Sequence, residues 1–146
     1  MARSEVSYTY DADTAFRAPG SVAVTATGEI GTLALDVMTN AREGDQKGKL
    51  GAEFYDVVIA VEASEAGTAA TYTFDVEVQD VGGGNPATAG ALEVPATVAG
   101  QYVIKLDGHT LEKLSASRGE LALNLTLGGT GGSITFSAWL AYGAGA

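Results

Sequence analysis

The sequence predicts an all-β protein folded as an antiparallel β-sandwich of about eight strands, and three observations support this. Apolar and polar residues alternate with a period of two along most of the chain, as in strands that bury one face. Glycine-rich turn signals, such as residues 82–86 and 128–132, separate the alternating segments. Only residues 109–115 show helical spacing, so we expect at most one short helix.

The clearest strand is residues 71–79, in which four large apolar side chains share one face and the polar residues between them share the other. The same alternation predicts further strands at residues 102–106, 121–127 and 134–140, with shorter candidates at 5–10, 21–26, 32–37 and 92–98. Pro95 lacks the N–H that a sheet ladder needs, so we expect the last of these at a sheet edge or bulge.

Three segments depart from simple alternation. Residues 54–62 are apolar at both parities, as expected of a central strand that is covered on both faces. Leu111 and Leu114 are three positions apart, which predicts a short helical turn over 109–115 with Thr110 as its N-cap. Residues 40–50 are the most polar stretch of the chain and are expected to form an exposed loop.

Composition narrows the class of protein. The length of 146 residues predicts one domain, 1–146, with residues 1–15 as a candidate extended N-terminal arm. The absence of cysteine and the single histidine exclude disulfides, Cys-based metal centres and sites with two imidazoles. The formal net charge of −10 argues against nucleic-acid binding. We find neither a leader pattern nor an apolar run suited to a membrane, so we expect synthesis in the host cytoplasm.

No segment carries a complete catalytic or metal-binding motif. Asp11 and Asp13 have the spacing that opens a calcium loop but lack its other ligands, which favours a capped turn. The glycines of residues 128–132 have no following lysine or helix, which favours a hairpin turn over a phosphate loop. His109 follows Asp107, but no Gly-x-Ser-x-Gly elbow completes a triad. We therefore expect no catalytic, cofactor-binding or metal-binding residues and no enzyme activity.

Candidate partner contacts are five aromatic residues and one arginine, in positions that alternation assigns to outer faces or that lie near a free end. Trp139 shares parity with polar residues, so it packs under a loop, meets a protein partner or forms a ligand platform. The N-terminal segment alternates too, and either joins the domain's own sheet or adds to the sheet edge of another chain. The residues predicted to contact a partner are Tyr8, Tyr10, Phe16, Arg17, Phe54 and Trp139.

The order of these segments resembles that of a known family. A tyrosine-rich first strand is followed by GEIGTLALD, YDVVIAVE and ATYTFDV, and the chain closes with residues 121–127 and with SITFSAWL. This layout is similar to that of the small jelly-roll cement, or decoration, proteins on tailed-bacteriophage capsids. The resemblance implies jelly-roll topology, no catalysis, and oligomeric contacts that clamp neighbouring capsid subunits. It assigns no individual functional residue.

The expected function is that of a structural virion protein on the capsid surface, which binds the outside of a tailed-phage capsid and stabilises contacts between major capsid subunits. Its expected partners are the major capsid protein and further copies of itself, as a dimer or trimer, with no nucleic acid and no membrane. Net charge keeps free copies soluble, and many contacts on a lattice multiply modest affinities. Two alternatives stay open: a β-module of a phage tail or fibre, and a carbohydrate-binding β-sandwich.

Overall fold

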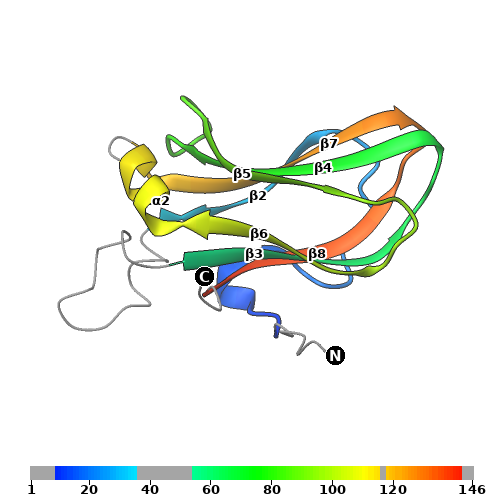
Figure 1. Cartoon of the computed structure of the whole chain (residues 1–146), viewed down its shortest axis with the longest axis horizontal. Helices are drawn as coiled ribbons and strands as arrows, with labels where there is room; N and C mark the ends of the chain where they lie inside the picture. The colour runs from blue at the N-terminus through cyan, green and yellow to red at the C-terminus, as the bar shows by residue number, and fades with distance from the viewer. Residues whose placement is uncertain (1–8, 36–53, 116–117, 143–146) are drawn as a thin grey trace, which may run out of the picture.

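A computed structural model describes residues 9–35, 54–115 and 118–142 of the chain. The strands form two four-stranded sheets that face each other (Figure 1). In chain order the elements are η1 (Ala12–Thr14), β1 (Ala15–Arg17), β2 (Gly28–Ala34), β3 (Phe54–Ser64), β4 (Thr68–Gln79), β5 (Ala87–Val94), β6 (Gly100–Asp107), α2 (Gly108–Leu114), β7 (Glu120–Thr130) and β8 (Ile134–Tyr142).

The strand pairing is that of a long hairpin rolled up on itself. β1 pairs with β8, β2 with β7, β3 with β6 and β4 with β5, all antiparallel. The pairings of β3 with β8 and β4 with β7 complete a first sheet, β1-β8-β3-β6, and a second sheet, β2-β7-β4-β5. This arrangement is a jelly roll. It confirms the predicted antiparallel sandwich of about eight strands with one short helix.

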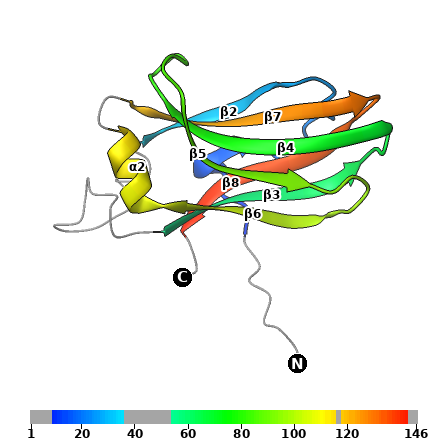
Figure 2. The same cartoon turned by 45° about the horizontal axis from the view of Figure 1, so that its top comes forward.

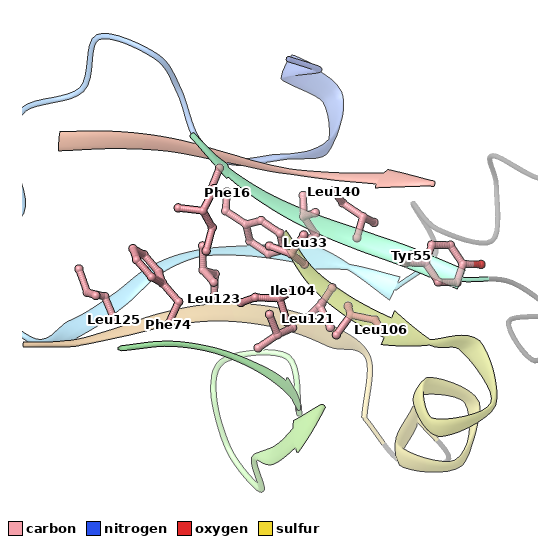
Figure 3. Close-up of a cluster of buried hydrophobic side chains, with 14 of the residues drawn as sticks. Phe16, Leu33, Tyr55, Phe74, Ile104, Leu106, Leu121, Leu123, Leu125 and Leu140 are labelled. Atoms are coloured by element: carbon pink, nitrogen blue, oxygen red, sulfur yellow. The ribbon is translucent and has the colours of Figure 1, made fainter. Parts of the chain in front are cut away.

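Alternate side chains from both sheets fill the space between them. At the centre, Phe74 of β4 meets Phe136 of β8 edge to face, with ring centroids 5.0 Å apart and planes at 79°. Leu121, Leu123 and Leu125 of β7 are fully buried in the same layer (Figure 3). The period-two pattern of the sequence therefore corresponds directly to the inward-facing side chains of the sandwich.

Polar side chains that are buried lie on the outer faces of the sheets. In the described part of the chain these are Asp56, Gln79 and Ser137, and each stands next in sequence to a core residue. Because neighbouring residues of a strand point to opposite faces, these three point away from the core. The layer between the sheets is thus built from apolar and aromatic side chains.

Two aspartates cap the short helical segments. The Asp107 carboxylate accepts a hydrogen bond of 3.1 Å from the N–H of His109, so Asp107 is the N-cap of α2. The predicted N-cap, Thr110, was wrong because β6 runs directly into the helix. The Asp11 carboxylate accepts in the same way from the N–H of Asp13 at 2.9 Å, which confirms the capped turn.

Three of the shorter predicted strands are displaced. Residues 21–26 form only an isolated bridge, between Val24 and Ile134. The strands expected at 32–37 and 92–98 are instead Gly28–Ala34 and Ala87–Val94. β5 is an edge strand and ends directly before Pro95, as the missing N–H requires. The predicted loop 40–50 and most of the predicted strand 5–10 lie outside the described residues.

The edges of the two sheets approach each other at Gly31. A Cβ at this position would collide with the carbonyl oxygen of Phe16 on β1. β2 also has a bulge between Glu29 and Gly31, which adjusts its course along this edge. Because Gly31 has no side chain, β1 can lie directly against β2 at the point where Phe16 enters the core.

The Tyr72 hydroxyl links two of the turns that connect one sheet to the other. It accepts from the N–H of Ser133 at 2.8 Å, and the carbonyl oxygens of Glu65 and Ser133 lie 2.6 and 3.0 Å away as acceptors for its proton. Tyr72 is fully buried. The turn between β3 and β4 is thereby fixed to the start of β8.

We predict that Gly31→Ala lowers the free energy of unfolding by about 1–3 kcal/mol, because the methyl group forces the two edges apart. Thermal unfolding measures the loss. Gly28→Ala is the matched control, since a Cβ at Gly28 meets nothing within 4 Å and should change stability by only about 0.5 kcal/mol. Equal losses in the two variants would contradict the role of the close approach.

We also predict that Tyr72→Phe costs about 1–3 kcal/mol, because the N–H of Ser133 loses its acceptor. Tyr102→Phe is the control. Its hydroxyl makes one hydrogen bond of 2.9 Å, to Val98, in an exposed setting, so the loss should be about 0.5–1 kcal/mol. Chemical denaturation of the two variants beside the wild type distinguishes these outcomes, and a larger loss for Tyr102→Phe would contradict the prediction.

Candidate binding surfaces

The residues predicted to contact a partner do not form one common surface. Tyr8 lies outside the described residues, and Phe54 is described only as the first residue of β3. The structure brings the others together where the segment leading into η1 and β1 runs along β8, but buries two of them and half-buries two. These four are Tyr10, Phe16, Arg17 and Trp139.

Trp139 lies on the outer face of the first sheet, yet it is only 2% exposed. The ring of Tyr10 meets it edge to face, with centroids 5.5 Å apart and planes at 84°. The hydroxyl of Thr14 donates to the carbonyl of Leu140 at 2.7 Å and holds the same segment against β8. Of the three readings that the sequence left open for Trp139, the structure supports packing under a loop, since little of the ring is left exposed to a partner or a ligand.

Phe16 points into the sandwich instead of toward a partner. It is 6% exposed and belongs to the core. Its assignment to a contact surface is corrected for a physical reason: β1 has three residues, and Phe16 is the side chain with which this short edge strand joins the core. A partner that meets this edge would contact its neighbours.

Arg17 fastens the loop that follows β1. Its guanidinium carbon lies 5.2 Å from the centre of the Phe136 ring, a cation–π distance. Its Nη2 donates to the carbonyl of Val22. Arg17 is half-buried, and both of these contacts are made within its own chain.

The central strand of the first sheet is covered on both faces, as predicted. Val57 faces the core and Val58 faces outward, and both are fully buried. Asp56, also on the outer face, is fully buried, with its Oδ1 3.6 Å from Nζ of Lys105. The Lys105 side chain is 65% exposed, so solvent contacts this ion pair on the lysine side and not at the carboxylate.

The outer face of the second sheet is acidic, and we call it the acidic face. Strands β2, β7, β4 and β5 contain no Lys, Arg or His. Register places Asn124 of β7 between Asp75 of β4 and Glu29 of β2. The carboxylates of this face are Glu29, Asp75, Glu77, Glu93 and Glu120.

Two of the acidic strands are joined to β4 through one amide. The Nε2 of Gln79 donates to Glu29 at 3.2 Å and to Glu120 at 2.7 Å. Gln79 is 4% exposed, and its amide N–H groups are hydrogen-bonded to these two carboxylates. This bridge partly offsets the repulsion between acids on β2 and β7.

The surroundings of Glu77 shift the pKa of its carboxyl. Desolvation raises its pKa above the ordinary value of 4.5, and the hydrogen bond and negative charge of Asp75 raise it further. The charge of Glu29 acts in the same direction, while a hydrogen bond to Asn124 opposes the shift. Glu77 therefore holds a proton more readily than an isolated surface carboxyl would.

The alternation of residues 71–79 already put Asp75 and Glu77 on one face of a strand. It could not show that Glu29, Glu93 and Glu120 join them, because that depends on which strands pair. The only sequence signal was the lack of cations in these segments.

A shallow hollow lies beside the turn between β7 and β8. It is lined by residues 25–27, by Leu127 and Ser133, and by glycines of the turn, with no charged side chain. Gly129 and Gly131 have φ of 70° and 73°, which glycine adopts without strain. The chain therefore turns between two strands here, as predicted, but the turn is not a hairpin, because β7 and β8 lie in different sheets and do not pair with each other.

Comparison with known proteins found no matching family model, no matching curated protein and no matching solved structure. Within residues 9–35, 54–115 and 118–142, no three His, Cys, Asp or Glu side chains are grouped as metal ligands. In the same part of the chain, no helix has the length and hydropathy needed to cross a membrane.

We predict that Glu77→Gln raises the melting temperature at pH 7. A carboxyl with a raised folded-state pKa binds a proton that the unfolded chain has lost, so wild-type stability falls as pH rises through that pKa. The advantage of the variant should shrink as pH falls to about 4, where both states hold the proton.

Melting curves between about pH 4 and pH 8 test this, since they span the ordinary carboxyl range. Glu93→Gln is the control, because it removes one exposed charge from the same face. If both variants gained the same stability with the same pH dependence, the effect would belong to net charge and not to the surroundings of Glu77.

Proposed function

We propose that the protein is a structural virion component that binds the outside of a tailed-phage capsid and stabilises contacts between major capsid subunits. In this proposal it is made in the host cytoplasm, carries out no catalysis and ends on the capsid surface. The observation that carries the proposal is the jelly roll whose interior is filled with apolar side chains. Such a molecule meets its partners with outer faces, edges and loops.

Architecture supports this role. Jelly rolls recur in viral capsid and lectin domains. The core spans both sheets, and the two ends of the roll are tied by Tyr72 and by α2, whose Leu111 is fully buried. A rigid body of this kind can hold two capsid subunits at a fixed distance, because little conformational entropy is lost when it docks.

Electrostatics points to the kind of surface that it would contact. The acidic face has no cation in any of its four strands, so it complements a basic patch and repels other acidic proteins. On a capsid lattice, one such contact per copy is repeated many times.

The carbohydrate-binding alternative loses its main support in the structure. It relied on Trp139 as an aromatic platform, and Trp139 is 2% exposed beneath Tyr10. The tail or fibre alternative has the same geometric support as the capsid role. Electron microscopy of labelled particles separates the two by showing whether heads or tails carry the protein.

Cosedimentation with purified capsids tests the proposal. We expect the full chain to pellet with capsids built from the major capsid protein of the same genome, and to raise the temperature at which those capsids disrupt. Binding should weaken as salt rises, because the contact is electrostatic. A protein that stayed in the supernatant at all salt concentrations would contradict the proposal.

A pair of charge reversals tests the contact surface. Glu93→Lys alters the acidic face on β5, and we expect it to weaken capsid binding by about tenfold. Glu62→Lys makes the same change at an exposed position on β3 of the first sheet and should leave binding within about twofold. Equal losses would show that net charge, and not the acidic face, governs binding.

A further inference from the structure

The end of the sandwich opposite α2 carries very little charge (Figure 2). Register brings its turns together, since Ser64 pairs with Ile134 and Thr68 with Thr130. Each of the four turns at this end leads from one sheet to the other, and we call them the low-charge end: residues 18–27, 65–67, 95–99 and 131–133. Their single charged residue is Glu65, whereas 18% of the whole chain is charged.

An apolar side chain projects from the low-charge end. Val22, on the loop between β1 and β2, is 83% exposed. Its carbonyl accepts a hydrogen bond from Nη2 of Arg17, and two residues later Val24 pairs with Ile134. The loop is therefore held on both sides of Val22, which presents this side chain in a fixed place. Covering an exposed valine removes apolar surface from water, which favours association.

The hollow beside the turn between β7 and β8 lies on the same loop, and its first lining residue, Thr25, follows Val22 by three positions. Its volume is about 460 Å³, within the range of about 300–1,000 Å³ that ligand clefts have. Ala26 and Leu127 supply apolar surface, and no charged or aromatic side chain is among the lining residues. The Thr27 hydroxyl already accepts a hydrogen bond from the N–H of Leu127. Such a lining suits a small aliphatic side chain better than a charged group.

Charge favours a second copy of the chain as the partner of this end. Each copy has a net charge of −10, so two copies repel each other least where the surfaces in contact carry the fewest charges. The low-charge end offers Glu65 alone, with the guanidinium of Arg17 at the base of the Val22 loop. The acidic face instead has five carboxylates and no cation in its strands, so a basic partner gains more by binding there.

We propose that two copies of the chain associate through their low-charge ends, with Val22 of each copy seated in the hollow of the other. The contact is isologous, because the same valine and the same hollow meet twice across a two-fold axis, and the dimer is therefore closed. Both halves of the contact form together, since Val22 and the hollow belong to one loop. The dimer does not use the acidic face and forms in the free protein, so it does not depend on the proposed capsid role.

Sedimentation of the wild-type protein from about 1 µM to about 1 mM measures the assembly. We expect a concentration-dependent dimer of twice 14.8 kDa. Val22→Asp places a charge in both apolar contacts and should raise the dissociation constant about tenfold or more. Val81→Asp is the matched control, because Val81 is 78% exposed in the turn between β4 and β5 at the other end. It has the same net charge and should leave the dissociation constant within about twofold.

The same experiment separates self-association from other uses of this end. A wild-type monomer at every concentration, or equal weakening by Val22→Asp and Val81→Asp, would overturn the proposal. A monomeric wild type whose pelleting with capsids is abolished by Val22→Asp would overturn it too, and would assign the low-charge end to the capsid subunit. Both valines are exposed, so unchanged melting temperatures should show that neither variant acts by unfolding the protein.

Cysteine cross-linking tests the seating of Val22, since the chain has no cysteine of its own. Ala26 is an exposed residue of the hollow. A mixture of Val22→Cys and Ala26→Cys should form a reducible covalent dimer under mild oxidation, because residues in contact come within the Cα separation of about 4.4–6.8 Å that disulfides need. Val22→Cys alone should cross-link less, because each valine faces the hollow of the other copy and not the other valine. Stronger cross-linking of Val22→Cys with itself would overturn the reciprocal seating.

Discussion

The edge-to-face contact between Phe74 and Phe136 joins the middle of one sheet to the middle of the other. The guanidinium carbon of Arg17 on β1 lies 5.2 Å from the centre of the same Phe136 ring. One aromatic ring therefore contacts residues of both β4 and β1 from its place on β8. Around it, each strand hides a row of apolar side chains in the same layer. Because that layer excludes charge, every carboxylate of the strands is forced to an outer face or an edge.

The uneven distribution of charge follows from this constraint together with strand order. Rolling the hairpin makes β2, β7, β4 and β5 neighbours, and these four strands happen to lack cations. Their carboxylates then share one face, where Gln79 bridges Glu29 and Glu120. Desolvation and the nearby Asp75 raise the pKa of Glu77. A folded state that concentrates like charges in this way gives up stability at neutral pH, and such concentrations are typical of surfaces that meet an oppositely charged partner.

The closure of the sandwich uses small, local devices. Gly31 lets β1 approach β2, Tyr72 ties two turns through one hydroxyl, and Tyr10 with Thr14 holds the N-terminal segment over Trp139. These contacts take up aromatic residues that would otherwise suggest a ligand site. In the described part of the chain, the acidic face is a surface that these contacts leave open for a partner.

Sequence by itself determined the fold class, because period-two alternation is a local property that a strand carries wherever it pairs. It located the long strands β3, β4, β6, β7 and β8 and the outward parity of Trp139. It missed the limits of β2 and β5, where bulges and edge positions depend on neighbours. Only the tertiary structure decided strand order, the burial of Trp139 and Phe16, and the assembly of five carboxylates on one face. These depend on contacts between residues far apart in the chain, and alternation records which side of a strand a residue faces but not what lies opposite it.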